Sequence, residues 1–169
     1  MAHWLSRLVK HRLVDEDDAR RLLGKDALAR IEARVAASEK RHSGEIRVVV
    51  EAGLPLSYLR RGATPRERAV ALFGKLGVWD TERNNGVLVY LLIAERAIEI
   101  VADRGLSRIV PATEWAAIAT SMQSAFQAGE FEGGLLRAVD AVDVLLVRHF
   151  AARPGDVDVN ELPDAPLLR

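Results

Sequence analysis

Residues 86–94 read GVLVYLLIA, an almost unbroken apolar run. Apolar side chains occupy both faces of this run, so it predicts a central strand that is covered on both sides. A short polar turn, Glu95-Arg96, separates it from a second strand-like run, AIEIVA, at residues 97–102. Two strands joined by so short a turn are typical of an antiparallel hairpin, so we expect these two to pair in that way.

A further strand is predicted upstream at residues 45–52, EIRVVVEA, where β-branched side chains dominate. Between this strand and the central one lies the sequence Thr64-Pro65-Arg66-Glu67. It combines an N-cap, a proline at the first helical position and a glutamate three residues after the cap, so it predicts the start of a helix. Because a helix joins the strands at 45–52 and 86–94, we expect these two strands to be parallel.

The remaining helices are predicted from apolar residues at helical spacing. They cover residues 2–14, 26–41, 113–128 and 131–150. The whole order predicts an α/β protein, a three-layer α/β/α sandwich with a small mixed sheet. Residues 151–169 contain three prolines and little periodicity, so we expect them to form a flexible tail. The predicted organisation is an N-terminal amphipathic segment at 1–18, an α/β domain at 19–150 and this tail.

The composition is that of a globular domain without unusual chemistry. Lys plus Arg and Asp plus Glu number 24 each, so the formal net charge is zero. Proteins that bind nucleic acids generally carry a basic excess, so no nucleic-acid partner is expected. The chain has no cysteine, which excludes disulfides and thiol nucleophiles. The histidines lie far apart in sequence, so we expect no metal ligands among them and place them at the surface or in caps: His3, His11, His42 and His149.

Residues 1–14, MAHWLSRLVKHRLV, predict a short amphipathic helix. Trp4, Leu5, Leu8 and Val9 fall on one face, and basic residues cover the other. Basic residues also interrupt the apolar ones, so the segment lacks the continuous apolar core of a secretory signal. We expect a cytoplasmic protein, and two interpretations of the helix stay open. It either binds a membrane surface or membrane-associated complex, peripherally at the inner membrane, or docks on the domain itself.

Polar residues gather at one end of the predicted hairpin. The start of its first strand lies beside the end of its second, which brings Asp80, Asn84 and Asn85 near Asp103 and Arg104. Two interpretations of this cluster stay open. It is either a cation or phosphate site, or a set of ordinary turn residues, because Asn-Asn-Gly and Asp-Arg-Gly are both natural turn sequences.

As a phosphate-ester site, the cluster would use Asp103 and Asp80 as carboxylates and Arg104 as the phosphate clamp. The residues expected to bind beside them are Asn84, Asn85, Gly86 and Ser107. If the strand at 45–52 is parallel to the central strand, the turn at 42–44 joins the same end of the sheet. Two further carboxylates, Asp140 and Asp143, lie one turn apart in the last helix, and we expect both to face solvent.

Four segments, in this order, resemble the TPM-domain family. They are SGEI at 43–46, NNGVLVYLL at 84–92, IEIVADRGL at 98–106 and AFQAGEFEGGL at 125–135. The resemblance spans roughly residues 26–150 and implies an α/β/α sandwich. The family includes a plant thylakoid acid phosphatase and proteins of photosystem repair, and some members bind calcium at the sheet edge. The resemblance therefore implies a phosphatase-like site at the same end of the sheet.

Two positions depart from the family pattern. Asn84 stands where the family commonly has aspartate before Asn-Gly, and Ser107 stands where it commonly has glutamate after Gly-Leu. Calcium takes about six to eight oxygen ligands and favours carboxylates, and only Asp80 and Asp103 are left here. We therefore expect no cofactor, with calcium as the alternative. The predicted function is a non-catalytic TPM module that works by binding, and the alternative is a phosphate-ester hydrolase.

Overall fold

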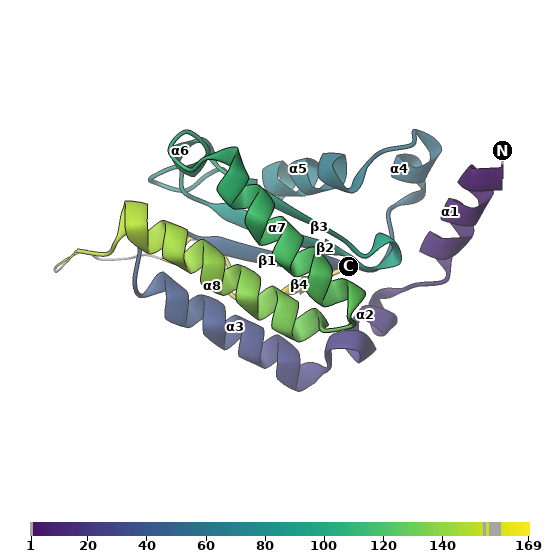
Figure 1. Cartoon of the computed structure of the whole chain (residues 1–169), viewed down its shortest axis with the longest axis horizontal. Coiled ribbons are helices and arrows are strands. Elements are labelled where there is room, and N and C mark those ends of the chain that lie inside the picture. Colours follow the sequence, from purple (N-terminus) through teal and green to yellow (C-terminus); the bar gives the residue numbers. More distant parts are fainter. Residues whose placement is uncertain (1, 154, 156–159) are drawn as a thin grey trace.

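The computed structural model describes residues 2–153, 155 and 160–169, with side chains from Leu5 onward. The predicted place of the Trp4 side chain on the apolar face of the first helix therefore lies outside the described residues. Within the described part, four strands form one mixed sheet in the order β3-β2-β1-β4 (Figure 1). Their bounds are β1 (Ile46–Glu51), β2 (Val87–Leu92), β3 (Ala97–Ala102) and β4 (Leu167–Leu168).

The pairing of the three long strands confirms the sequence prediction. Strand β1 runs parallel to β2, with Ile46 opposite Val87. Strands β2 and β3 form the antiparallel hairpin, with Val87 opposite Ala102. Every residue of β2 is buried, because alternate side chains meet helices on opposite faces of the sheet. The unbroken apolar run in the sequence thus reflects a strand that is covered on both sides.

Helices cover both faces of the sheet and complete the predicted sandwich (Figure 1). Val87, Val89 and Leu91 of β2 pack toward one helical layer, and Leu88, Tyr90 and Leu92 pack toward the other. The first layer comprises α2 (Glu16–Leu23), α3 (Lys25–Glu39), α7 (Ala112–Gln127) and α8 (Phe131–Phe150). The second comprises α4 (Leu56–Arg60) and α5 (Pro65–Lys75), with α1 (Ala2–Arg12) beside α4.

Several short elements were not predicted from the sequence. They are α2, α4, α6 (Arg104–Ser107) and the 3-10 turn η1 (Ile93–Glu95). The acidic residues at 15–18 form the N-terminus of α2. Asp15 accepts a hydrogen bond from the backbone of Asp18, and the Asp18 carboxylate accepts one from the backbone of Asp15. Two aspartates thus form the capping box that serine or threonine and glutamate usually provide.

The expectation of a flexible tail is wrong for residues 160–169. Leu167 and Leu168 of β4 pair in parallel with Val49 and Val50 of β1. Near the start of β1, the guanidinium of Arg47 donates hydrogen bonds to the carbonyls of Pro163, at 2.7 Å, and of Ala165. A proline-containing segment without periodicity is therefore held by the edge of β1 and by a buried arginine, which no local sequence pattern indicates.

Carboxylates secure the start of this C-terminal segment. Just before β1, Glu45 accepts hydrogen bonds from the backbone N–H groups of Glu161 and Leu162, each at 3.2 Å. Glu39, at the end of α3, is only 7% exposed and accepts a hydrogen bond from the N–H of Ile46 at 3.0 Å. Burial raises the pKa of Glu39 to about 9, and the carboxylates of Glu45 and Asp164 add to this effect. Glu39 is therefore protonated at neutral pH.

This buried acid makes the stability of the fold depend on pH. The folded-state pKa of Glu39 lies above its ordinary value of 4.5, so its stabilising contribution is complete below about pH 4.5 and is lost as the pH rises through about 9. Glu39→Gln keeps the shape of the protonated acid but cannot ionise. We expect the melting temperature of the native chain to fall between about pH 6 and 9, and that of Glu39→Gln to fall less.

Glu32→Gln provides the matched control for this measurement, because Glu32 is exposed on the same helix. Its pH profile should follow that of the native chain. If the profiles of Glu39→Gln and the native chain run parallel throughout this range, Glu39 does not ionise on unfolding as proposed.

Candidate functional site

The turn that enters β2 lies against the turn that leaves β3. The N–H of Asp103 donates to the carbonyl of Gly86 at 2.9 Å, and the N–H of Gly105 donates to the carbonyl of Asn84 at 2.8 Å. This confirms the predicted neighbourhood of the two turns. Asn84 has a φ of 52°, in the left-handed region that asparagine tolerates better than most residues. The asparagine thus suits this sharp turn.

Two glycines allow the backbones to approach this closely. A Cβ at Gly86 would lie 2.0 Å from the carbonyl oxygen of Val78, and one at Gly105 would lie 2.3 Å from that of Asn84. Neither distance is accessible to a real side chain, and the opposing atoms belong to the backbone. Glycine is therefore required by packing at both positions, whatever the chemistry of the site.

The polar side chains at this end of the sheet mostly contact one another. Arg104 donates from Nε to the Oδ1 of Asn84 at 2.9 Å. Asp103 caps the short helix α6, where its Oδ1 accepts from the N–H of Arg104 at 2.6 Å. The contact between Arg104 and Asn84 thus joins the two turns through side chains as well as through the backbone.

Asn85 connects the same turn to the start of β1. It is fully buried, and its Nδ2 donates to the carbonyl of Ser43 at 2.9 Å. Its backbone N–H donates to the hydroxyl of Thr81 at 3.1 Å. The turn at 42–44 therefore joins this end of the sheet, as parallel pairing of β1 and β2 predicts.

The predicted site residues are only partly brought together. Asn84, Asn85 and Gly86 share one end of the sheet with Asp103 and Arg104. Across the described residues, no side-chain hydrogen bond or ion pair joins the exposed Asp80 to any of them. Ser107 is exposed at the end of α6. The catalytic and binding roles assigned to these residues stay predictions.

Among the described residues of this group, Asp103 has a buried polar atom that lacks a hydrogen-bond partner. Asp103 is 8% exposed, and its Oδ2 is buried without a hydrogen-bond partner among the described residues. A buried carboxylate oxygen in this state favours a proton donor or a cation. Asp103 is therefore the residue at this end of the sheet that is best suited to bind a proton donor or a cation.

The donor set does not fit calcium, the ion that the family resemblance suggests. The Oδ1 of Asn84 already accepts from Arg104, whose positive guanidinium lies at the same place. Over the described ranges, no group of three or more His, Asp or Glu side chains is arranged to hold a metal ion. One buried carboxylate beside a guanidinium supplies far fewer than the roughly six oxygen ligands that calcium takes.

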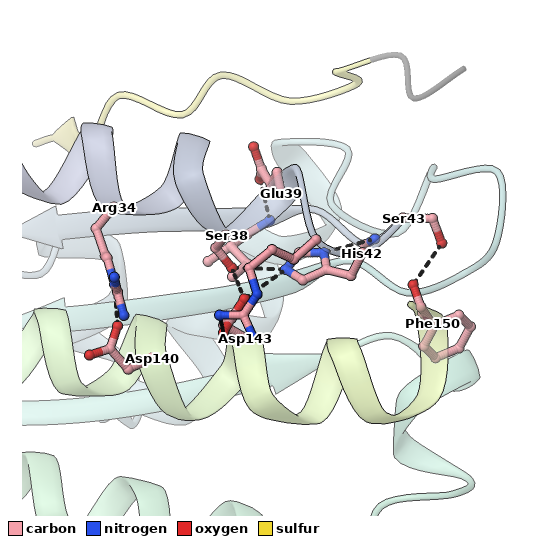
Figure 2. A network of polar contacts seen from close by, with 11 residues as sticks. Arg34, Ser38, Glu39, His42, Ser43, Asp140, Asp143 and Phe150 are labelled. Carbon is pink, nitrogen blue, oxygen red and sulfur yellow. Dashed lines mark hydrogen bonds and ion pairs between the residues drawn. The ribbon is translucent and has the colours of Figure 1, made fainter. Parts of the chain in front are cut away.

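The structure contains a second buried polar network that the sequence did not predict. His42 was expected at the surface or in a cap, and Asp143 was expected to face solvent. Both are buried and lie between α3 and α8 (Figure 2). The Nε2 of His42 lies 2.8 Å from the Oγ of Ser38, which donates to the Oδ1 of Asp143 at 2.9 Å. Arg41 donates to the other oxygen of Asp143 at 2.9 Å. Asp140, the other carboxylate of this helix that was expected to face solvent, pairs instead with Arg34 at the exposed surface of α3 and α8.

The Ser38-His42-Asp143 network has the composition of a catalytic triad but not its chemistry. The N–H of Gly44 donates to the Nδ1 of His42 at 3.2 Å, so the neutral ring carries its proton on Nε2. That proton points to Ser38, so the ring cannot accept the serine proton as a general base does. All three residues are also buried. The network therefore clamps α3 to α8 and to the start of β1.

Helix α1 forms a separate surface feature, and its orientation is unexpected. The helix docks by polar residues: Arg7 donates to the Oε1 of Glu95 at 2.8 Å, and the Nε2 of His11 lies 2.8 Å from the same oxygen. His11 is buried and accepts from the N–H of Leu54 at 3.0 Å. The ion pair with Arg7 helps to lower the pKa of Glu95 against the opposing effect of burial. The helix thus docks on the domain through Arg7 and His11, with Leu8 packed against the core beside them.

The outward side of α1 is apolar. Val9 and Leu5 are each 53% exposed, and Leu13, just after the helix, is 75% exposed. Their spacing of four residues places them on one stripe. Lys10 and Arg12 are exposed on either side of it. Within the described residues, no helix has the length and apolar character needed to cross a membrane.

Comparison with known proteins agrees with this fold. The family model described as the TPM domain matches residues 17–145. The NMR structure of the BA42 protein from the psychrophilic bacterium Bizionia argentinensis is similar, with 26% identity and a TM-score of 0.73, over 86% of this chain and 94% of that one. The N-terminal domain of a P. gingivalis protein shares the fold alone, with 22% identity and a TM-score of 0.63, over 79% and 83% of the two chains. No curated protein matches the chain.

Proposed function

Because the chain belongs to the TPM-domain family, we propose that it is a non-catalytic TPM module that binds an anionic membrane surface through α1. The observation that carries this proposal is the orientation of α1. Arg7, His11 and Leu8 face the domain, and the stripe of Leu5, Val9 and Leu13 faces outward. An amphipathic helix normally buries its apolar side against its own domain, so an outward stripe favours an apolar partner.

Charge around the stripe favours a lipid surface. Lys10 and Arg12 flank it, so apolar side chains would enter the acyl boundary while the cations meet anionic headgroups. The docked state of Arg7 and His11 also orients the helix before it binds, which reduces the ordering cost of association. Because α1 is docked on the domain, binding of this one helix would hold the whole domain at the membrane.

The end of the sheet supports a role without catalysis. The side chains of Asn84, Asn85 and Arg104 hold the turns together, and the carboxylates that a metal would require are replaced or distant. Groups that are held by structural contacts must give up those contacts before they can bind a substrate. We infer that Asn84, Asn85 and Arg104 act here mainly by holding the turns at the end of the sheet together.

The membrane proposal is tested by flotation with vesicles. We expect the native chain to float with phosphatidylglycerol–phosphatidylcholine vesicles and far less with phosphatidylcholine alone. Val9→Asp removes an apolar contact and adds a negative charge, so it should weaken binding roughly tenfold or more.

Val144→Asp is the matched control, because Val144 on α8 is also 53% exposed. It should float like the native chain, and thermal unfolding should show that both variants are folded. Equal flotation of Val9→Asp and Val144→Asp, or no flotation of the native chain, would remove α1 as the binding element.

Asp103 favours a second candidate function, a phosphate-ester hydrolase. Its Oδ2 is buried without a partner, and Arg104 lies next to it as a potential phosphate clamp. On this alternative, the purified chain hydrolyses an aryl phosphate and Asp103→Asn loses that activity, because the amide can neither ionise nor act as a base. Activity of Asp103→Asn equal to that of the native chain would dismiss this site, and an inactive native chain would dismiss the alternative.

A further inference from the structure

Strand β3 is an outer strand of the sheet, and its outer edge is not paired with another strand of the described chain. In an antiparallel pair, alternate residues direct both backbone groups toward the partner strand. The N–H of Asp103 donates to Gly86, so residues 97, 99 and 101 face β2 in the same way. The N–H and C=O groups of Ile98, Ile100 and Ala102 therefore point away from the sheet.

Two side-chain contacts confirm this alternation. Arg66 of α5 donates to the carbonyl of Ile100, and Gln123 of α7 donates to the carbonyl of Arg96 at 3.0 Å. Both acceptors are at even-numbered positions, on the outward side of the strand. Within the described residues, the N–H groups of Ile98, Ile100 and Ala102 donate no backbone hydrogen bond. The edge thus offers donors and acceptors at the spacing of an extended backbone.

A cavity of about 300 Å³ follows this edge between α5 and α7. Arg66 lines it from α5, and Ile100 and Ala102 line it from β3. On α7 its wall is formed by small residues one helical turn apart, Ala112, Ala116 and Ala119, beside Trp115. Alanines leave room where larger side chains would cover the strand. The Nε1 of Trp115 is buried without an acceptor among the described residues, so this wall also holds an unused donor.

The geometry points to one kind of occupant. We propose that an extended segment of a partner protein, with alternating apolar β-branched side chains, adds to β3 as a fifth strand in this groove. Main-chain hydrogen bonds to Ile98, Ile100 and Ala102 would provide affinity, and the alanine wall would select apolar side chains of moderate size. The helices on both sides nearly bury Ile98 and Ile100. An extended segment needs only the strand edge between these helices, whereas a second copy of the chain would bring its own α5 and α7 against them.

Arg66 controls access to this edge. Its side chain is 52% exposed, donates to the Ile100 carbonyl and lies 3.6 Å from the Oε2 of Glu99. A long charged side chain placed across an open strand protects it from unintended pairing. A peptide strand must displace it from Ile100, after which Glu99 remains as its ionic partner. Removal of the guanidinium should therefore make peptide addition easier.

The experiment measures amide hydrogen exchange by NMR in the full chain with a synthetic octapeptide, acetyl-Lys-Thr-Val-Thr-Val-Thr-Val-Lys-amide. At saturating peptide we expect exchange of Ile98, Ile100 and Ala102 to slow at least tenfold, with Ala97, Glu99 and Val101 nearly unchanged. Arg66→Ala should bind the same peptide more tightly. Val9→Asp should bind it normally, because this groove does not involve α1.

Two N-methylated peptides provide the control, one methylated on the threonines and the other on the valines. Only one set of alternate amides faces β3, so one peptide should lose binding and the other should keep it. No protection of the three amides in either the native chain or Arg66→Ala overturns the proposal. So does equal binding of the two methylated peptides. Protection without peptide that increases with protein concentration would instead assign the edge to a second copy of the chain.

Discussion

The close approach of two turns at one end of the hairpin is the constraint on which the rest of the structure depends. Gly86 and Gly105 allow backbone to meet backbone there, and the hydrogen bonds from Asp103 and Gly105 fix the register of β2 and β3. Asn85 extends this closure to Ser43 and thus to the start of β1. This arrangement places the turns before β1 and β2 and the turn after β3 together at one end of the sheet.

The strands, their pairing and the two helical layers could be predicted because their signals are local. An unbroken apolar run identified β2, and the capped sequence at 64–67 identified the start of α5. The C-terminal segment had no such signal, because Arg47 and Glu45, more than a hundred residues away, hold it in place. The Ser38-His42-Asp143 network was missed for the same reason, since Asp143 reaches it only through the packing of α8 on α3.

The sequence predicted which residues of the candidate site lie close together, but not how they contact one another. Pairing geometry brought Asn84 and Arg104 together as expected, but sequence could not indicate that they would bind each other. Asp80 stays at the surface, away from these contacts. Apart from the Oδ2 of Asp103, the groups of this site contact one another, which suits them to holding a shape. The two binding proposals rest on other features, the apolar stripe on α1 and the open edge of β3.

The measurement that tests this account most directly is the stability of three glycine variants, determined by chemical unfolding. Gly86→Ala and Gly105→Ala force a Cβ into backbone atoms, so each should lower the free energy of unfolding by about 1–3 kcal/mol or more. Gly74 lies in α5 with open space around it, so Gly74→Ala should instead stabilise the chain by roughly 0.5–1 kcal/mol. If Gly86→Ala and Gly105→Ala were as stable as the native chain, the two turns would not be packed together and the closure would not exist.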